Sequence, residues 1–547
     1  MFKSHGLSIF AVVIAAFISL PVIIIASYLV KADGVLWQHL FETVLNEYLV
    51  NSLLLLFGVG AGVLLLGVPT AWLTSMCSFP GRRWFSWALL LPLAVPAYII
   101  AYTYAGLLDF AGPVQTWIRE FTGLSYGDYW FFEIRSLGGA IIMLSLVLYP
   151  YVYLMARAAF LEQSVSSIEV GCSLGYSRWR AIWSLALPMA RPAIIAGLSL
   201  ALMETLADYG TVQYYGVSTF TTGIFRTFYG FGDVAAAAQL AASLLAFVIL
   251  LVLLERYSRR QARYHSAAES RARADLIPLV GSKAILAVAI CLLPLILGFI
   301  IPATQLLLWA LFEAQPLGWD FVALAWNSFS LAFLAAIITV LLAIILSYAK
   351  RTKPIKPINT AITMAGFGYA LPGTIIAIGI LIPLAWADHK LMALFEYMSL
   401  DSPGLLLSGS LVALLFAYTV RFLAVALGSV QSGLEKIKPS LDHAGSSMGH
   451  KPLAILRKIH VPLMRSSILT AVLIVFVDVL KELPATLILR PFNFNTMAVR
   501  AYELASDERL VDAAPASIMI VLVGLVPVLM LHASITHRRP HLHEKFK

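Results

Sequence analysis

The sequence has very little charge for its length. Only 12% of its 547 residues are Asp, Glu, Lys or Arg, where soluble domains carry roughly 25%. In contrast, 60% of the residues are hydrophobic and the mean hydropathy is +0.86. A water-soluble chain of this composition would lack enough polar side chains to cover its surface. The composition therefore predicts an integral membrane protein.

Two further absences limit its chemistry. Cys77, Cys172 and Cys291 are too few and too scattered for a disulfide framework or a metal cluster. The chain has no G-x-x-x-x-G-K-[ST] loop with which to bind nucleotide phosphates. We therefore expect that it is not an enzyme and binds no cofactor. Any ATP and Mg²⁺ that drive it would be held by a separate subunit.

Long apolar segments occupy most of the chain. A transmembrane helix needs about 20 predominantly apolar residues, whereas membrane β-strands alternate over roughly ten, a pattern that does not appear here. The sequence predicts an all-α membrane protein with about twelve spans. They are expected near residues 7–30, 49–76, 85–108, 138–160, 188–208, 236–254, 284–311, 325–349, 359–385, 405–428, 465–488 and 515–533.

Basic residues are concentrated in alternate loops, which indicates the orientation of the chain. Lys and Arg gather near 82–83, 178–191, 256–273, 350–356, 436–458 and 538–547. Cytoplasmic loops are enriched in these residues, so both termini are expected in the cytoplasm. The basic runs are therefore interpreted as topology signals and lipid contacts, not as a nucleic-acid site.

The chain is predicted to be an internal duplication. Asn51 and Ser52 recur as Asn327 and Ser328, and the 96–101 segment recurs at 372–377 with the same separation, which is close to half the chain length. Each half holds six spans, and an even number makes the repeats parallel. We predict a first permease domain at 1–255, a basic cytoplasmic linker at 256–282 and a second permease domain at 283–547.

A short motif recurs in one basic loop of each half. In both copies nine residues separate a glycine from an apolar-x-apolar-Pro sequence. This spacing predicts a short helix, a glycine turn and a second helix that ends before the proline. Such an element would fit a cleft on a cytoplasmic ATPase and transmit its closure; the alternative is an ordinary helix–turn–helix loop. The residues assigned to the two copies are Glu169, Gly171, Gly175 and Pro188, and Asp442, His443, Gly445, Gly449 and Pro462.

Both copies resemble the E-A-A loop of ABC importer permeases. The resemblance implies a type I importer fold, two copies of a cytoplasmic ATP-binding subunit and an external solute-binding protein. The copies also depart from the pattern. Val170 and Gly171 replace two alanines in the first, while the second has His443 in the Glu position, Asp442 just before it and Gly445 for the last alanine. The two ATPase contacts are therefore not expected to be equivalent.

Carboxylates occupy one span of each half. Glu204 and Asp208 lie four residues apart, on one helical face, and Asp478 and Glu482 match them at the corresponding positions of the second half. Charged residues within spans are rare and often mark ion pathways, and carboxylate oxygens suit a hard cation. The four are candidates for the substrate pathway and for transient metal binding near the external mouth. Alternatively, they cap a helix end or pair with Lys481 or an arginine, including one on a docked partner.

The surrounding stretches are similar to a narrower family. Residues 203–212 with 219–224, and residues 480–494, resemble the fused twelve-span permeases of bacterial ferric-iron importers, and the resemblance covers essentially the whole chain. It implies a multi-pass protein of the bacterial inner membrane, a periplasmic iron-binding protein and a dimeric ATPase. Thiamine, sulfate and polyamine permeases share the architecture and stay as alternatives. A secondary transporter or channel without an ATPase is a further alternative, which the paired motifs argue against.

Overall fold

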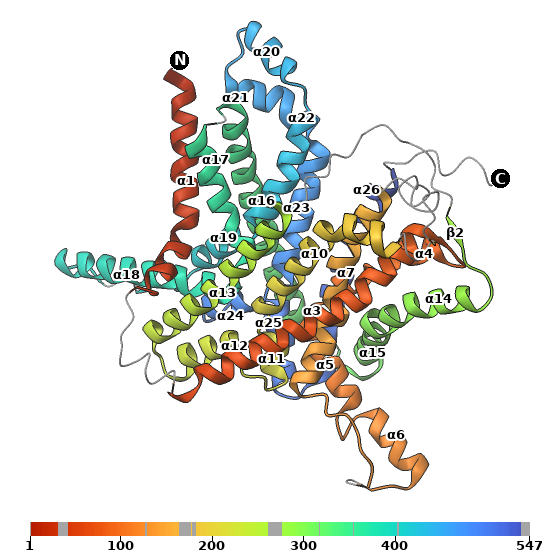
Figure 1. Ribbon diagram of the computed structural model, residues 1–547. Coiled ribbons are helices and arrows are strands. Elements are labelled where there is room, and N and C mark those ends of the chain that lie inside the picture. The colour runs from red at the N-terminus through yellow and green to blue at the C-terminus, as the bar shows by residue number, and fades with distance from the viewer. Residues whose placement is uncertain are drawn as a thin grey trace. The chain divides into compact units, whose positions relative to one another are not determined.

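The fold is almost entirely helical (Figure 1). The computed structural model describes residues 2–30, 42–125, 128–162, 177, 182–260, 276–316, 318–353, 355–401 and 404–537. Within these ranges the strands are β1 (Cys77–Ser78) and β2 (Ile277–Pro278), which form one short parallel pair. The predicted all-α fold class is confirmed.

Ten helices in the described ranges are long and apolar enough to cross a membrane, or up to twelve if each of two bent helix pairs is one span. This agrees with the predicted number of about twelve. The straight candidates include α1 (Phe2–Ser27), α3 (Leu45–Met76), α7 (Leu137–Glu162), α10 (Leu187–Ala207), α13 (Val234–Arg260), α16 (Trp319–Thr352), α18 (Gly373–Tyr397), α19 (Leu411–Glu435) and α26 (Leu510–His537). A further candidate runs from Ser282 to Glu313 through α14 (Ser282–Leu295), η4 (Ile296–Ile300), α15 (Ile301–Leu308) and η5 (Trp309–Glu313).

Proline marks an equivalent helix break in each half. In the first half, α4 (Arg82–Ala88) and η1 (Leu91–Ala94) are bent by 90° from α5 (Ala97–Leu108) and α6 (Pro113–Thr122). Pro96 is the N-cap residue of α5, and Pro372 is that of α18, after α17 (Lys356–Ala365) and η6 (Gly366–Ala370). Both prolines have extended ψ values, 143° and 140°, that a continuing helix cannot adopt.

The helix boundaries reproduce the duplication read from the sequence. The helices α7 and α19 begin at matching positions of the repeat, and so do α5 and α18. The short helices α11 (Gly210–Tyr214) and α24 (Pro484–Leu489) also begin at matching positions. The two halves therefore begin several equivalent helices at matching positions of the repeat.

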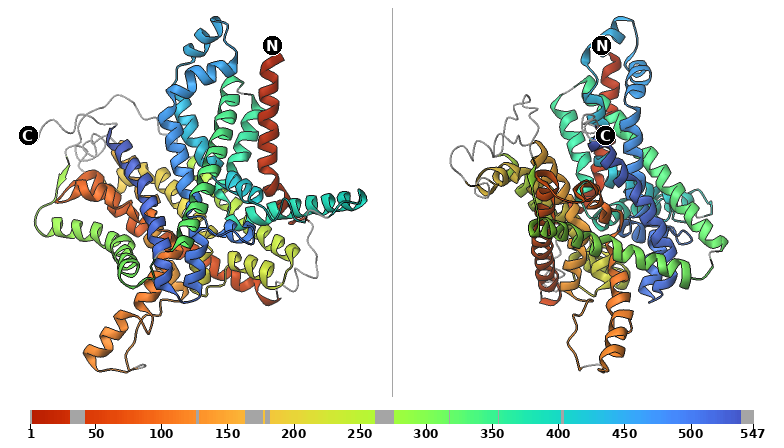
Figure 2. Two further views of the ribbon diagram at one scale, coloured as in Figure 1. Left: turned by 180° about the vertical axis from the view of Figure 1, so that it is seen from behind. Right: turned by 90° about the vertical axis from the view of Figure 1, so that its right-hand side faces the viewer.

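The chain forms two compact units, and each contains parts of both sequence halves. Unit 1 comprises residues 1–43, 223–246 and 316–500, and unit 2 comprises residues 44–222, 247–315 and 501–547. The core of unit 1 is α16, α19 and α23 (Arg465–Leu480), and α1 packs mainly against α17 and α18. Figure 2 shows the chain from two further sides. The equivalent helices α3, α7 and α10 form the core of unit 2. The boundaries at 255 and 283 follow the sequence repeat, and the division into two permease domains and a linker stays a prediction.

Candidate coupling loop and membrane carboxylates

The second copy of the loop motif folds as two short helical segments joined by a turn. The first is α20 (Pro439–Ser447). The second runs through α21 (Pro452–Ile455), the π-helix η7 (Leu456–His460) and α22 (Val461–Leu463). The predicted helix–turn–helix is confirmed. The predicted end before Pro462 is wrong, because the helix continues to Leu463 and bends by 79° at Met464, where α23 begins. Pro462 lies inside this continuous helix, after the π-helix η7 and two residues before the bend, and it cannot donate a backbone hydrogen bond there.

Gly449 makes the turn that ends α20. Its φ is +79°, a left-handed backbone conformation that residues other than glycine adopt only with strain. The His450 N–H donates to the Gly445 carbonyl at 3.1 Å, and the Gly449 N–H donates to the Ser446 carbonyl at 3.0 Å. This pair of hydrogen bonds is the Schellman motif, which satisfies carbonyls at the helix end. Gly449 is therefore required by the backbone conformation of the turn.

Gly445 lets the two helical segments pack closely. A Cβ atom built on Gly445 would lie 3.1–3.3 Å from side-chain carbons of Ile455 and Ile459. Gly445 is buried, while its neighbours His443 and Ala444 are exposed. The side of α20 opposite the packed side thus carries His443 at the position where the family pattern has glutamate.

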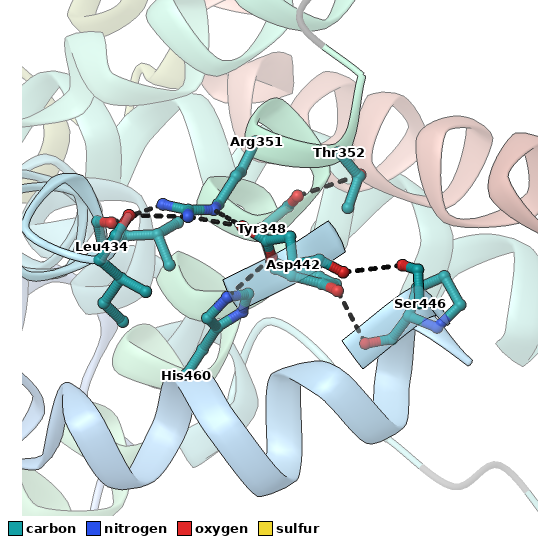
Figure 3. Close-up of polar contacts among 9 residues, drawn as sticks. Tyr348, Arg351, Thr352, Leu434, Asp442, Ser446 and His460 are labelled. Atoms are coloured by element: carbon teal, nitrogen blue, oxygen red, sulfur yellow. Dashed lines mark hydrogen bonds and ion pairs between the residues drawn. The ribbon is translucent and has the colours of Figure 1, made fainter. Parts of the chain in front are cut away.

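Asp442 points inward and holds the loop to a membrane helix (Figure 3). Its Oδ2 accepts hydrogen bonds from Arg351 Nη2 at 2.6 Å and Nε at 3.0 Å, and Arg351 lies at the end of α16. Arg351 also donates to the backbone carbonyls of Leu434 at 2.6 Å and Ile437 at 2.8 Å, at the end of α19. One guanidinium thereby joins α16, α19 and the coupling loop.

His460 completes this cluster from the second segment. Its Nε2 lies 2.8 Å from Asp442 Oδ1, and its side chain is fully buried. The His460 ring also packs 5.4 Å from the ring of Tyr348, whose hydroxyl donates to the Pro452 carbonyl at 2.7 Å. Burial lowers the pKa of His460, and the nearby Arg351 adds to this effect, while Asp442 opposes it. Burial thus favours the neutral form of the imidazole.

Most of the first copy of the motif lies outside the described residues, including Glu169, Gly171 and Gly175. Its end is described. The π-helix η2 (Ile182–Ala186) precedes α10, as η7 precedes α22 at the matching position of the second half. Pro188 is exposed near the start of α10. Unlike α22 and α23, α10 continues to Ala207 without a break. The two halves therefore differ in how the loop joins its span.

Asp208 and Glu482 make the same contacts in both halves. Asp208 accepts hydrogen bonds from the Thr211 and Val212 N–H groups and from the Thr211 hydroxyl, at 3.0–3.1 Å. Glu482 likewise accepts from the N–H groups of the two matching residues, Ala485 and Thr486, and from the Thr486 hydroxyl, at 2.8–3.1 Å. Both carboxylates thus satisfy the first amides of a short helix, α11 or α24.

In the second half each of the two acids also has a cationic neighbour. Asp478 Oδ1 lies 2.8 Å from Lys481 Nζ, and Glu482 Oε1 lies 3.7 Å from Arg421 Nη1. Glu204, on α10 in unit 2, is partly buried. Among the described residues no group of three or more His, Cys, Asp or Glu side chains is arranged to hold a metal ion. The observed contacts therefore support the interpretation of these acids as helix caps and ion-pair partners. Passage of a cation along them stays a prediction.

Sequence reasoning missed Arg351 and Arg421. Arg351 was interpreted as part of a basic loop, and only the fold brings it to Asp442, 91 residues away. Arg421 lies within the predicted span 405–428, and a charge inside a span is itself a signal of function. The sequence does not identify Glu482 as the partner of Arg421, because this pairing depends on how α19 packs.

Comparison with known proteins defines the class. Residues 6–264 match the family described as the inner membrane component of binding-protein-dependent transport systems. The first half of the chain is thus a domain of this family, and the second half repeats its helix order. The chain is therefore similar to membrane permeases of the ABC importer class.

The individual relatives are more specific. The chain is 27% identical to the Fe(3+)-transport system permease protein FbpB 2 of Haemophilus influenzae, over 90% of this chain and 91% of that protein. It is 21% identical to the ferric transport system permease protein FbpB of Actinobacillus pleuropneumoniae, over 79% of this chain and 63% of that one. The molybdenum transport system permease protein ModB of Escherichia coli matches at 24%, over 41% of this chain and 95% of its own length.

Proposed function

We propose that this chain is the fused membrane permease of an ATP-driven, binding-protein-dependent importer for ferric iron. The observation that carries the proposal is the similarity to an Fe(3+)-transport permease over nine-tenths of both chains. A match of this extent includes both halves, whereas the molybdenum permease matches 41% of the chain. The linear organisation into two permease domains and a linker is part of the same proposal.

The partners follow from the permease class. Two copies of a cytoplasmic ATP-binding subunit would bind the two loops, one at 169–188 and one at 443–462. A periplasmic iron-binding protein would deliver the substrate to the other side. With basic loops on the cytoplasmic side, both termini lie in the cytoplasm and the protein resides in the bacterial inner membrane. ATP and Mg²⁺ are bound by the partner subunits.

The coupling step uses the contacts of Asp442. When the ATP-binding subunits close, they push on α20 and the segment that follows it. Asp442 and Arg351 pass this displacement to the ends of α16 and α19, while the 79° bend at Met464 passes it to α23. Rigid helices joined by buried polar contacts move together, so the core of unit 1 changes position as a body.

The pathway is proposed to run past the four membrane carboxylates. Glu204 and Asp208 serve the first half, and Asp478 and Glu482 serve the second. The side chains of Lys481 and Arg421 reduce the negative charge that the second pair presents to the substrate.

A second candidate substrate is an oxyanion such as molybdate or sulfate. Arg421 favours it, because a guanidinium inside a span suits an oxyanion better than a metal cation. The extent of the matches favours iron over this alternative.

Uptake by reconstituted vesicles tests the proposal. Purified permease and ATP-binding subunit are placed in vesicles with the cognate binding protein outside, and radioactive ferric iron, molybdate and sulfate are supplied in parallel. Iron uptake that requires ATP and the binding protein is the expected result. Uptake of an oxyanion in place of iron would replace the proposed substrate, and uptake without ATP would place the chain in another transport class.

A further inference from the structure

Gly373, Arg421 and Glu482 meet at the start of α18, inside unit 1, and Thr374 follows Gly373 in the same helical turn. Gly373 and Thr374 form the first turn of this 25-residue helix. Arg421 reaches the turn from α19, and Glu482 reaches it from the break between α23 and α24. The place is a buried polar cluster among membrane helices, and we call it the α18 cluster.

Gly373 brings the helix end against the ion pair. A Cβ atom built on Gly373 would lie 2.6 Å from Arg421 Nη1 and 2.6 Å from Glu482 Oε1. Any side chain at this position would displace both groups. The backbone at the start of α18 is therefore in contact with the pair, and the helix dipole adds partial positive charge there.

The α18 cluster has donors that lack acceptors. Within the described part of the chain, Arg421 Nη1 and Thr374 Oγ1 make no hydrogen bond, although Arg421 is only 9% exposed and Thr374 is fully buried. The carboxylate of Glu482 is already engaged by two N–H groups and a hydroxyl of α24. Its distance of 3.7 Å from Arg421 Nη1 is too long for a hydrogen bond. Buried donors without acceptors are costly, so a missing acceptor is the simplest explanation of this geometry.

The first half does not repeat this arrangement. The residues that match Gly373, Arg421 and Glu482 at the repeat offsets are Ala97, Val147 and Asp208. Only the carboxylate is retained, and it caps α11 without a guanidinium at the matching position. The guanidinium of the α18 cluster is thus a property of the second half.

We propose that the α18 cluster is a binding subsite for an anionic oxygen, with Arg421 Nη1, Thr374 Oγ1 and the amino end of α18 as its donors. The link to transport rests on the proposed function: the anionic oxygen belongs to a ligand that accompanies ferric iron, either an inorganic oxyanion or an organic carboxylate. A bare trivalent cation would be repelled by Arg421, whereas an iron complex that presents its own anionic oxygens would be held by it. Iron then passes the second half as a complex.

Anion binding is measured first without iron. The permease with its ATP-binding subunit is placed in lipid nanodiscs, and the rise of the unfolding temperature is followed against phosphate, citrate and chloride at constant ionic strength. Phosphate or citrate should stabilise the wild type, and R421Q and T374V should weaken the apparent affinity roughly tenfold. The control R83Q, at an exposed arginine on α4, should behave as the wild type. Equal stabilisation of wild type and R421Q, or none by either anion, would overturn the subsite.

R421Q leaves Glu482 without its cationic partner and could misfold for that reason. Two more variants distinguish misfolding from the loss of an anion ligand. R421K keeps the charge but loses the planar fork, and the double variant R421Q/E482Q removes both charges together. If the subsite exists, both variants insert normally, R421K retains part of the anion affinity and the double variant loses it. Full anion affinity in the double variant would contradict the proposal.

Uptake measurements then distinguish phosphate from citrate as the anion. They also distinguish failure of the proposed transport function from failure of the anion subsite. Vesicles receive radioactive iron as a phosphate or a citrate complex. A loss of roughly tenfold in R421Q for one complex identifies its anion as the ligand. A loss for both complexes shows that Arg421 binds an anionic oxygen of either anion. Wild-type vesicles that take up no iron refute the proposed function but leave the anion-binding result standing. Wild-type iron uptake that R421Q reproduces for both complexes refutes the subsite alone.

Discussion

Asp442 accepts two hydrogen bonds from the guanidinium of Arg351, at 2.6 and 3.0 Å, and both side chains are mostly buried. The contact lies one residue before the position where the family pattern has glutamate. The acidic side chain of the second loop is therefore engaged within the permease, and His443 faces outward in its place. Asp442 holds the loop to α16 and α19, and the exposed side chain in the glutamate position of the pattern is a histidine.

Replacing Asp442 with Asn should separate ATP hydrolysis from transport. The loss of a charge-assisted hydrogen-bond pair should destabilise the loop by about 2 kcal/mol. We expect iron uptake per ATP hydrolysed to fall several-fold in vesicles while the protein still inserts. E396Q, at an exposed acid on α18, is the matched control and should transport normally. An unchanged ratio of uptake to hydrolysis in D442N would show that the ion pair does not carry the coupling motion.

Gly449 and Gly428 form a matched pair of glycines for substitution by alanine. At Gly449 the left-handed φ of +79° should cost about 1–2 kcal/mol and weaken the turn of the coupling loop. At Gly428, within α19, a Cβ atom meets nothing within 4 Å, so alanine should be neutral or stabilise by about 0.5 kcal/mol. Thermal unfolding and iron uptake measure both effects. A bulky residue at Gly449, combined with one at Gly175, should abolish transport; normal uptake would refute the coupling role.

Amide substitutions should affect the two capping carboxylates unequally. D208N keeps an acceptor for the amides of α11 and should cost less than about 1 kcal/mol. E482Q keeps an acceptor for only one of the two α24 amides, which bond to different oxygens of Glu482. It also leaves the buried Arg421 without a counter-charge, which costs about 3 kcal/mol or more. The measurement is the unfolding temperature of the two purified variants. Equal losses would mean that Arg421 and Glu482 do not interact in the folded protein.

Acid should destabilise the coupling loop through His460. Its folded-state pKa is lowered by burial, while the unfolded value is near 6.5. The unfolded state therefore binds more protons below this value, and the contribution of the neutral imidazole is present above about pH 6.5 and lost as the pH falls. We expect the unfolding temperature of the wild type to drop more steeply between pH 7 and 5 than that of H460Q. Parallel pH profiles would assign the acid sensitivity to other groups.

Two separately expressed segments, residues 1–260 and 276–547, should restore transport only when they are produced together. Unit 1 combines α1 from the first segment with α16 to α19 from the second, and neither segment contains a whole unit. Affinity purification of one segment should recover the other. If either segment alone inserts as a protease-resistant unit, the predicted domains at 1–255 and 283–547 fold independently after all.

The features set by local chemistry were predictable from the sequence. Span lengths follow from apolar runs, the breaks follow Pro96 and Pro372, and the turn follows Gly449. The partners of Asp442 and Glu482 were not predictable in detail, because Arg351 and Arg421 are distant in sequence and reach them through helix packing. The short helices after Asp208 and Glu482 were hidden within or beside predicted spans. They explain Asp208 and Glu482 as helix caps, whereas the four-residue spacing of the acids also suggested a substrate pathway.

The packing of α1 in unit 1 also sets an order of events during synthesis. The helix is made first, yet its neighbours α16 to α19 belong to the second half of the chain, and the close approach of Gly379 to the Pro21 carbonyl joins the two regions. At about 5–20 residues per second, the ribosome needs on the order of 15–60 s to make the roughly 300 residues between them. During this interval α1 is in the bilayer without its final neighbours. The nascent protein therefore depends on lipid, or on the insertion machinery, to shelter its first helix until the second half arrives.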